Sequence, residues 1–351
     1  MDKLGIFPIT YDLLTLLRYK ELLQEEEIHA ISSFKEDMYL KVLEDEFGDI
    51  AVTADIEKFL KDVDTILLLD NENEFSLTKY RRIYSDALMQ QRKILVSTKL
   101  YSELRQEKKS NVQFLEKKGV EETELKVHEL YDNPLPVIAV CGMGKHCSKF
   151  ETMLLTLKVL KESEYQALVI GSNPLLSLVG GYVLPQYLYS EHISLENKVY
   201  KLSADLYQLQ NKRDADVILI EMPGGIMPVG TWEYNHFSEI ATVISNALKI
   251  DVGILNTYVP VQQEEVKLQL LKEFCDCKYG VPLEVMFMAR QRVEYDPYIR
   301  KCNYLNLDDE TYNNLYERYC ETDIVSLNNL EAAEDKIRQV VSLLEENAEF
   351  I

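Results

Sequence analysis

The feature that most constrains this chain is a regular alternation of short apolar runs with helical patterns along its length. Apolar runs typical of buried strands recur at residues 3–10, 28–34, 63–71, 92–101, 137–142, 165–174, 216–225, 251–260 and 282–293. Helical patterns stand between or after them at residues 11–27, 150–162, 195–212, 237–249, 263–275 and 330–346. Strands that alternate with helices predict parallel sheets covered by helices, so we expect an α/β fold.

The length of 351 residues predicts two domains. A strongly charged stretch at residues 105–132, followed by the helix-breaking "NPLP", marks the expected boundary. Residues 1–132 should form a Rossmann-like α/β domain with the charged connector. Its first turn, "FPITYD", has no glycine, so we expect no NAD or FAD there. Residues 133–351 should form a doubly wound, mostly parallel α/β domain that ends in a C-terminal helix.

The charge of the chain argues against nucleic acid as a partner. The sequence has 59 acidic and 38 basic residues, a net charge of -21, whereas nucleic-acid binding draws on Lys and Arg. We also expect no membrane association and a cytoplasmic location, because no targeting signal and no apolar run of about 20 residues is present. Six scattered cysteines fit reduced thiols better than a disulfide framework.

The stretch "VIAVCGMGKHCSKFETML" has the layout of a phosphate-binding loop between a strand and a helix. Such a loop curls backbone N–H groups around phosphate oxygens and adds a lysine at the start of the helix. The phosphate-binding candidates here are Gly142, Gly144, Lys145, Ser148 and Lys149. A tight turn between strand and helix, with ordinary solvated lysines, is the alternative.

Two positions of this loop depart from the usual pattern. Ser148 stands at the last glycine position, where positive φ would cost a serine about 1–2 kcal/mol. Phe150 replaces the Ser or Thr that holds magnesium, and Thr152 is a weak substitute on another face of the helix. The sequence therefore predicts a degenerate P-loop that holds ATP or GTP, if any nucleotide, with little help from magnesium.

Two motifs carry a resemblance to P-loop NTPases, which implies that residues 133–351 form a degenerate domain of that type. "GMGKHCSK" resembles the loop of cyclic 2,3-diphosphoglycerate synthetase, and "DVILIEMPGG" resembles the E-G-x-G-G element of dethiobiotin synthetase. The resemblance implies that Glu221 stands near a metal or the reacting group, as the candidate catalytic residue. It also implies that Gly224 and Gly225 line the cleft and let the backbone approach a ligand.

The whole chain most resembles the peptide maturation system family of ribosomal natural-product gene clusters. That resemblance implies a role beside a radical SAM maturase and a Cys-rich precursor peptide. Two functions of different class follow. The first is an accessory protein whose degenerate loop holds a nucleotide or phosphate, if it holds any ligand. The second is a nucleotide-dependent ligase or transferase acting on a peptide or a small carboxylate. Whether the protein is an enzyme stays open at this point.

Three further features each have two interpretations. Cys141, His146 and Cys147 in the loop, or Cys275 and Cys277, offer soft metal ligands, but neither group has the paired spacing of a structural zinc site, so we expect no metal. His236 is either a general base near "EMPGG" or a loop residue. The stretch from Pro174 through "LVGGYVLP" suggests a mobile segment where a lid would lie.

Overall fold

The computed structural model describes residues 2–24, 26–35, 43, 47–70, 77–104, 109–117, 128–212, 214–259, 268–318 and 323–348. The chain forms two compact units: unit 1 comprises Met1–Glu121 and Asn173–Gln186, and unit 2 comprises Glu122–Ser172 and Tyr187–Ile351. Residues 105–108 and 118–127 of the predicted connector, and Cys320, lie outside the described residues. The sequence-based boundary near Asp132 did not anticipate that the later segment Asn173–Gln186 belongs to unit 1.

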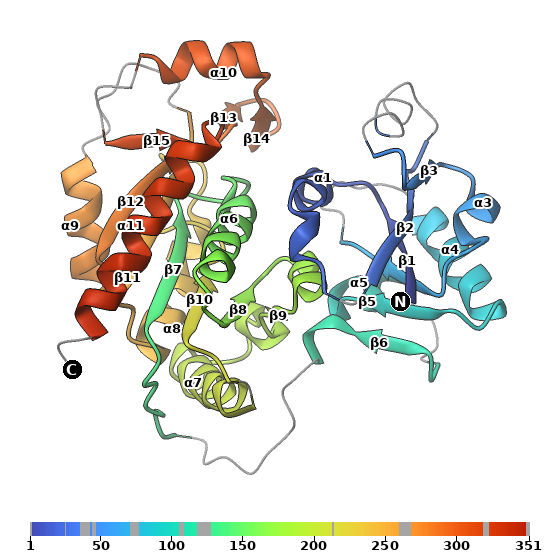
Figure 1. Cartoon of the computed structure of the whole chain (residues 1–351), viewed down its shortest axis with the longest axis horizontal. Coiled ribbons are helices and arrows are strands. Elements are labelled where there is room, and N and C mark those ends of the chain that lie inside the picture. Colours follow the sequence, from blue (N-terminus) through green and yellow to red (C-terminus); the bar gives the residue numbers. More distant parts are fainter. Residues whose placement is uncertain are drawn as a thin grey trace. The chain divides into compact units, whose positions relative to one another are not determined.

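Unit 1 is a parallel sheet with helices between its strands (Figure 1). Its strands are β1 (Asp2–Phe7), β2 (Glu26–Ser32), β3 (Ala51–Thr53), β4 (Thr65–Leu68), β5 (Lys93–Val96) and β6 (Val112–Phe114). Its helices are α1 (Tyr11–Arg18), α3 (Ile56–Leu60), α4 (Leu77–Met89) and α5 (Thr98–Leu104), with 3-10 turns η1 (Lys20–Leu22) and η2 (Leu115–Lys117). The strand order β3-β2-β1-β4-β5-β6 is that of a Rossmann sheet.

The predicted helix over residues 11–27 is wrong in its second half. Helix α1 ends at Arg18 and the chain enters β2 at Glu26, because pairing of β2 with β1 and β3 outweighs the helical preference of the Glu-rich stretch. The core of unit 1 lies between sheet and helices. There the buried rings of Phe7 and Tyr80 meet edge to face at 4.8 Å.

The stretch from Pro174 through "LVGGYVLP", predicted to be a mobile segment, lies within Asn173–Gln186, which packs into unit 1. It contains the 3-10 helix η3 (Pro174–Val179), whose leucines are buried, and the short strand β9 (Tyr182–Val183). The Asn173 amide donates to Asp12 at 2.6 Å, and the Gln24 N–H donates to the Leu178 carbonyl at 3.1 Å. These contacts make the segment part of the fold of unit 1.

Unit 1 also has an open cavity of about 660 Å³ at the ends of β2 and β3. Three cationic side chains (Lys35, Lys79 and Arg82) and two carboxylates (Asp55 and Glu57) contribute to its lining. The Lys79 ammonium donates to the carbonyls of residues 33 and 54, each at 2.5 Å, and so ties the two strand ends together. The residues that line the cavity all belong to unit 1.

Unit 2 is built on a second parallel sheet, whose strands run in the order β15-β12-β11-β7-β10-β8. These strands are β7 (Val137–Gly142), β8 (Ala167–Gly171), β10 (Val217–Glu221), β11 (Val252–Thr257), β12 (Leu283–Met288) and β15 (Ile324–Ser326). A separate antiparallel hairpin joins β13 (Gln291–Asp296) to β14 (Lys301–Asn306). The predicted single strand over residues 282–293 is therefore two strands, since β12 ends at Met288 and β13 turns away to pair with β14.

Helices cover the sheet of unit 2. They are α6 (Lys149–Glu162), α7 (Leu195–Lys212), α8 (Glu239–Ala247), α9 (Leu268–Tyr279), α10 (Asp309–Tyr316) and α11 (Leu330–Ala348), and η4 (Gln186–Tyr189) is a 3-10 turn. In Figure 1, α6 and α11 lie in front of the strands and α8 lies behind them. The strands facing these helices are almost wholly buried, as doubly wound sheets require.

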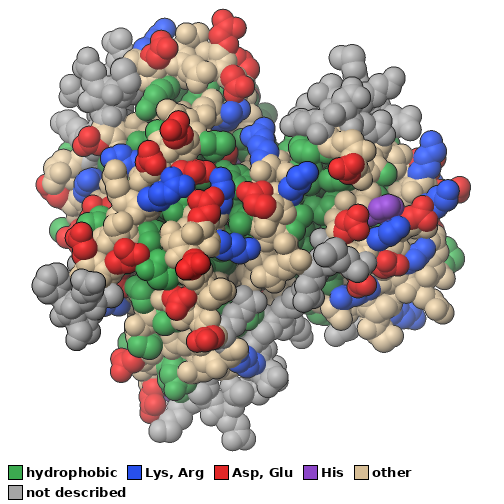
Figure 2. Space-filling view, viewed as in Figure 1, with side chains coloured by type: hydrophobic (Ala, Val, Ile, Leu, Met, Phe, Trp, Pro, Cys, Tyr) green, Lys and Arg blue, Asp and Glu red, His purple; other side chains and the backbone are tan. Residues whose placement is uncertain are grey.

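The surface carries charges of both signs. On the face drawn in Figure 2, acidic and basic side chains are interspersed. Among the described residues, no helix is long and apolar enough to span a bilayer.

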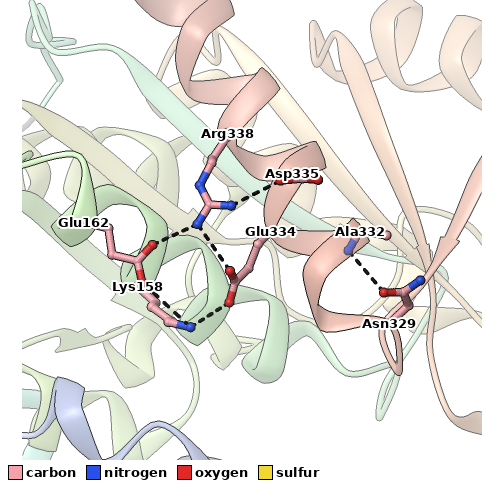
Figure 3. Close-up of polar contacts among 7 residues, drawn as sticks. All are labelled: Lys158, Glu162, Asn329, Ala332, Glu334, Asp335 and Arg338. Carbon is pink, nitrogen blue, oxygen red and sulfur yellow. Dashed lines mark hydrogen bonds and ion pairs between the residues drawn. The ribbon is translucent and has the colours of Figure 1, made fainter.

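An ion-pair network fixes α6, the helix that follows the predicted phosphate loop, to α11 (Figure 3). The Lys158 ammonium lies 2.6 Å from Glu334, and Arg338 bridges Glu334 and Glu162 at 3.3 and 3.0 Å. The hydrogen bond from Lys158 and the nearby Arg338 lower the pKa of Glu334. A carboxyl group with a lowered pKa stabilises the fold above its unfolded pKa and loses that contribution as the pH falls.

We expect Glu334→Gln to lower the free energy of unfolding by about 1 kcal/mol at neutral pH. The difference from the parent protein should shrink as the pH falls below 4.5, the ordinary pKa of a Glu, because the parent then protonates Glu334 as well. Urea unfolding between pH 3.5 and 7 measures this. Asp335→Asn is the control, since that side chain is 63% exposed against 17% for Glu334. A pH-independent difference would contradict the assignment.

Candidate functional site

The predicted phosphate loop, residues 142–149, joins the central strand β7 to helix α6. His146 and Ser148 have positive φ, at 50° and 55°, and Cys147 between them does not. Alternation of this kind turns successive N–H groups toward one side and forms an anion-binding nest. Each left-handed non-glycine residue costs about 1–2 kcal/mol. The loop therefore keeps the bent conformation even though Ser148 replaces a glycine.

The two glycines of the loop are required by close packing. A Cβ on Gly142 would lie 2.3 Å from the Cys147 sulfur, and one on Gly144 would lie 2.5 Å from the Tyr258 hydroxyl. The same tyrosine donates a hydrogen bond to the Lys145 carbonyl. The curled shape thus depends on residues without side chains at 142 and 144.

Lys149 connects the loop to the "EMPGG" element. Its side chain is only 7% exposed, and its ammonium donates to the Gly144 carbonyl at 2.8 Å and to the Gly224 carbonyl at 3.0 Å. A third contact reaches the Cys147 sulfur at 3.8 Å. Lys145, the residue after Gly144, is half-buried. The structure therefore brings the predicted lysine and the predicted second motif together.

Glu221 ends β10, the strand next to β7, and pairs in register with Val140. Its carboxylate is buried and accepts two hydrogen bonds from Ser172, from the N–H at 2.7 Å and from the hydroxyl at 2.8 Å. One backbone bond, from Ile226 N–H to the Gly142 carbonyl at 2.9 Å, fixes the element beside the phosphate loop. Glu221 thus lies at the carboxyl edge of the sheet, where open α/β sheets bind ligands.

The two glycines of "EMPGG" differ. Gly224 has φ of 77°, and nothing lies within 4 Å of the place a Cβ would take. Gly225 is crowded, because its Cβ would lie 2.3 Å from the Asn235 amide nitrogen and 2.4 Å from the Met143 carbonyl oxygen. Gly224 leaves open space for a ligand, whereas Gly225 allows the two loops to touch.

The side chains around the missing magnesium ligand are engaged elsewhere. Phe150 is buried in the core of unit 2. The Thr152 hydroxyl is fully buried and shares hydrogen bonds with the Asn256 amide at 2.8 and 3.2 Å. Thr152 therefore does not present its oxygen to the loop. Its hydroxyl is a weak substitute for the missing magnesium ligand because Asn256 already occupies it.

Two buried amides that the sequence analysis missed hold the phosphate loop from outside. The Asn235 amide donates to the Met143 carbonyl at 3.1 Å and to the Met227 carbonyl at 2.6 Å. The Ser148 hydroxyl donates to the Gln291 side chain at 2.8 Å, which in turn donates to Asn306 at 2.9 Å. No local pattern marks these residues, because their partners are distant in sequence.

The segment around His236 is not the helix start that the sequence predicted. Residues 235–238 form the turn η5 (Asn235–Ser238), and all four have left-handed φ, between 48° and 60°. Helix α8 begins only at Glu239. The buried Asn235 amide anchors this segment to the phosphate loop and so holds the costly conformation. His236 itself is exposed.

The soft ligands of the loop do not converge on one point. The Cys141 sulfur contacts Met222 at 3.4 Å, the Cys147 thiol donates to the Gly144 carbonyl at 3.1 Å, and the His146 ring lies 4.8 Å from Tyr304. Burial raises the pKa of the Cys141 thiol. Within the described part of the chain, no three His, Cys, Asp or Glu side chains are grouped as metal ligands.

Two parallel α/β units, the second with a phosphate-loop layout, define the class of this fold, and a solved structure shares it. The chain is similar to a DUF1611 family protein from Anabaena variabilis ATCC 29413, with a TM-score of 0.62, 13% identity, and coverage of 97% of this chain and 100% of that one. The predicted α/β fold class with two units is thereby confirmed. No family model matches the sequence, and no curated protein matches it.

Weaker likenesses fall on proteins that carry nucleotides in their structures. One is cobyrinic acid a,c-diamide synthase from Mycobacterium smegmatis with bound ADP and magnesium, at 13% identity over 53% of this chain and 82% of that one, with a TM-score of 0.30. Another is a nucleotide-binding protein from Archaeoglobus fulgidus in complex with ADP, at 14% over 57% and 86%, with the same TM-score.

Proposed function

We propose that unit 2 binds the phosphate groups of a nucleotide, ATP or GTP, at residues 142–149. The conformation of the loop carries this proposal. His146 and Ser148 have left-handed φ on either side of Cys147, which turns successive N–H groups toward one side, and they precede the N-terminus of α6, the positive end of its dipole. Lys149 needs only to exchange two carbonyl oxygens for phosphate oxygens to complete the site.

The same geometry supports slow hydrolysis. Phosphoryl transfer depends on a metal that bridges the terminal phosphate oxygens. Phe150 offers no oxygen, and the Thr152 hydroxyl is occupied by Asn256. Binding that relies on N–H groups and lysine does not need such a metal. Magnesium is therefore a minor contributor in this proposal.

Calorimetric titration of the full chain with ATP, GTP and tripolyphosphate tests it, with magnesium and with EDTA. We expect all three to bind, with dissociation constants that differ less than about threefold between magnesium and EDTA. We expect ATP to be hydrolysed no faster than in buffer without the protein. The absence of binding by all three at millimolar concentration would make the loop a structural turn. Robust magnesium-dependent hydrolysis would favour the ligase or transferase function instead.

That second function has one specific observation in its favour. Glu221 is a buried carboxylate at the carboxyl edge of the sheet, and the element that it begins is tied to Lys149 through Gly224. A carboxylate at this position is suited to act on a metal or a nucleophile beside the phosphates. Glu221→Gln should abolish any magnesium-dependent turnover if this function holds.

The biological role extends the resemblance noted in the sequence. We propose an accessory role in ribosomal peptide maturation, with a radical SAM maturase and a precursor peptide as partners. Its support is the sequence resemblance alone. Affinity purification of the full chain co-expressed with a maturase and precursor from such a gene cluster tests it. Failure of both to co-purify, with and without ATP, would count against the role.

A further inference from the structure

The only tryptophan of the chain is half-exposed and stacks on a tyrosine. Trp232 is 53% exposed, and its ring stacks on that of Tyr295 at 5.1 Å with an interplanar angle of 9°. Both rings belong to unit 2. Large aromatic surface left in water at a specific place commonly marks a binding site. The pair forms a flat, preassembled platform.

The segment carrying Trp232 is anchored to the phosphate loop. Val229 and Glu233 close a tight turn around Trp232 through a backbone hydrogen bond of 2.7 Å. Three residues after Trp232, the buried Asn235 amide donates to the Met143 carbonyl of the loop. The position of the indole is therefore fixed relative to the phosphate-binding residues.

The segment carrying Tyr295 is anchored to the same loop through a different contact. Tyr295 lies in β13, four residues after Gln291, whose buried side chain holds the Ser148 hydroxyl. Four residues of strand span about 13 Å. That reach suits the ribose and phosphate chain of a nucleoside triphosphate, which separate a base from its terminal phosphates.

We infer that the Trp232–Tyr295 pair receives the aromatic base of the nucleotide whose phosphates residues 142–149 hold. This inference rests on the proposed function and adds the site of the base. Stacking on a ring suits any base, because every base has a π face. ATP and GTP should therefore bind alike, and both should bind more tightly than tripolyphosphate, which has no base.

The intrinsic fluorescence of the full chain tests this, since Trp232 is its sole tryptophan. ATP and GTP should change the emission on saturation, and tripolyphosphate should bind with little change. By calorimetry, Trp232→Ala and Tyr295→Ala should each weaken ATP binding by about 5- to 150-fold and leave tripolyphosphate binding unaltered. Tyr298→Ala is the matched control, because that residue is 95% exposed in the turn of the same hairpin.

The outcomes separate the inference from the proposed function. If tripolyphosphate and ATP bind equally and Trp232→Ala changes neither, the inference is overturned while phosphate binding stands, and the rings serve another occupant such as a protein. If no phosphate compound binds, the proposed function fails and the inference falls with it. Circular dichroism and thermal unfolding of each variant confirm that a loss of binding is not a loss of fold.

Discussion

Replacing Lys149 with alanine is expected to lower the affinity for tripolyphosphate by about 10- to 150-fold. A hydrogen bond from a charged donor contributes about 1.5–3 kcal/mol, and each 1.4 kcal/mol is tenfold in affinity. The N–H groups of the loop remain in the variant, so binding should weaken and not vanish. Calorimetric titration of the full chain with tripolyphosphate in EDTA measures the change without any contribution from metal or base.

Lys249→Ala is the matched control for that experiment. Lys249 is also in unit 2, and its replacement removes the same charge, but its side chain is 89% exposed and its ammonium lies 3.9 Å from the Asp251 carboxylate. Its loss should change the affinity less than about twofold, because exposed charges are screened by salt. Equal losses in the two variants would show that net charge, and not the loop, governs binding. Thermal unfolding must accompany both, since Lys149 also joins two loops through Gly144 and Gly224.

Gly225→Ala is expected to lower the free energy of unfolding by about 3 kcal/mol. The Cβ of alanine would overlap the side-chain amide of Asn235 and the backbone carbonyl of Met143. Because a backbone carbonyl cannot rotate away as a side chain can, the two loops must separate. Overpacking of this kind costs about 1–3 kcal/mol, and the loss of the hydrogen bond from Asn235 adds about 1 kcal/mol. Urea unfolding followed by circular dichroism measures the difference.

The adjacent Gly224→Ala separates crowding from backbone strain. Gly224 has φ of 77° in open space, so alanine there meets no atom and only the left-handed conformation is penalised. That penalty is about 1–2 kcal/mol. We expect Gly224→Ala to cost less than Gly225→Ala. The reverse order would mean that the contact between Gly225 and Asn235 is not tight in solution.

The central strands of both sheets could be predicted because their apolar runs are long and continuous, whereas the edge strands β3, β6 and β15, of three residues each, were missed. The hairpin β13–β14 could not, since its alternating polar sequence carries a weak signal and Gln291 follows an apolar run without a break. The loop itself was predictable from Gly142, Gly144 and Lys149, and the positive φ expected of a residue at position 148 is observed. Whether these residues bind phosphate stays a prediction.

The contacts that hold the site could not be predicted for a different reason. Asn235 and Gln291 reach the loop across 92 and 143 residues of sequence, and only the folded sheet brings them there. The predicted helix start at residue 237 was wrong for the same reason. Residues 235–238 are left-handed, because tertiary anchoring overrode the local preference for helix.

The return of Asn173–Gln186 into unit 1 has a consequence for synthesis on the ribosome. Domains usually fold in order as the chain emerges, the first before the second. Here the first unit is not complete until residue 186 has left the ribosome, and by then β7, α6 and β8 of the second unit have emerged as well. The two units therefore cannot mature strictly one after the other, and an arrested chain ending near residue 132 should expose the surface that the leucines of η3 cover.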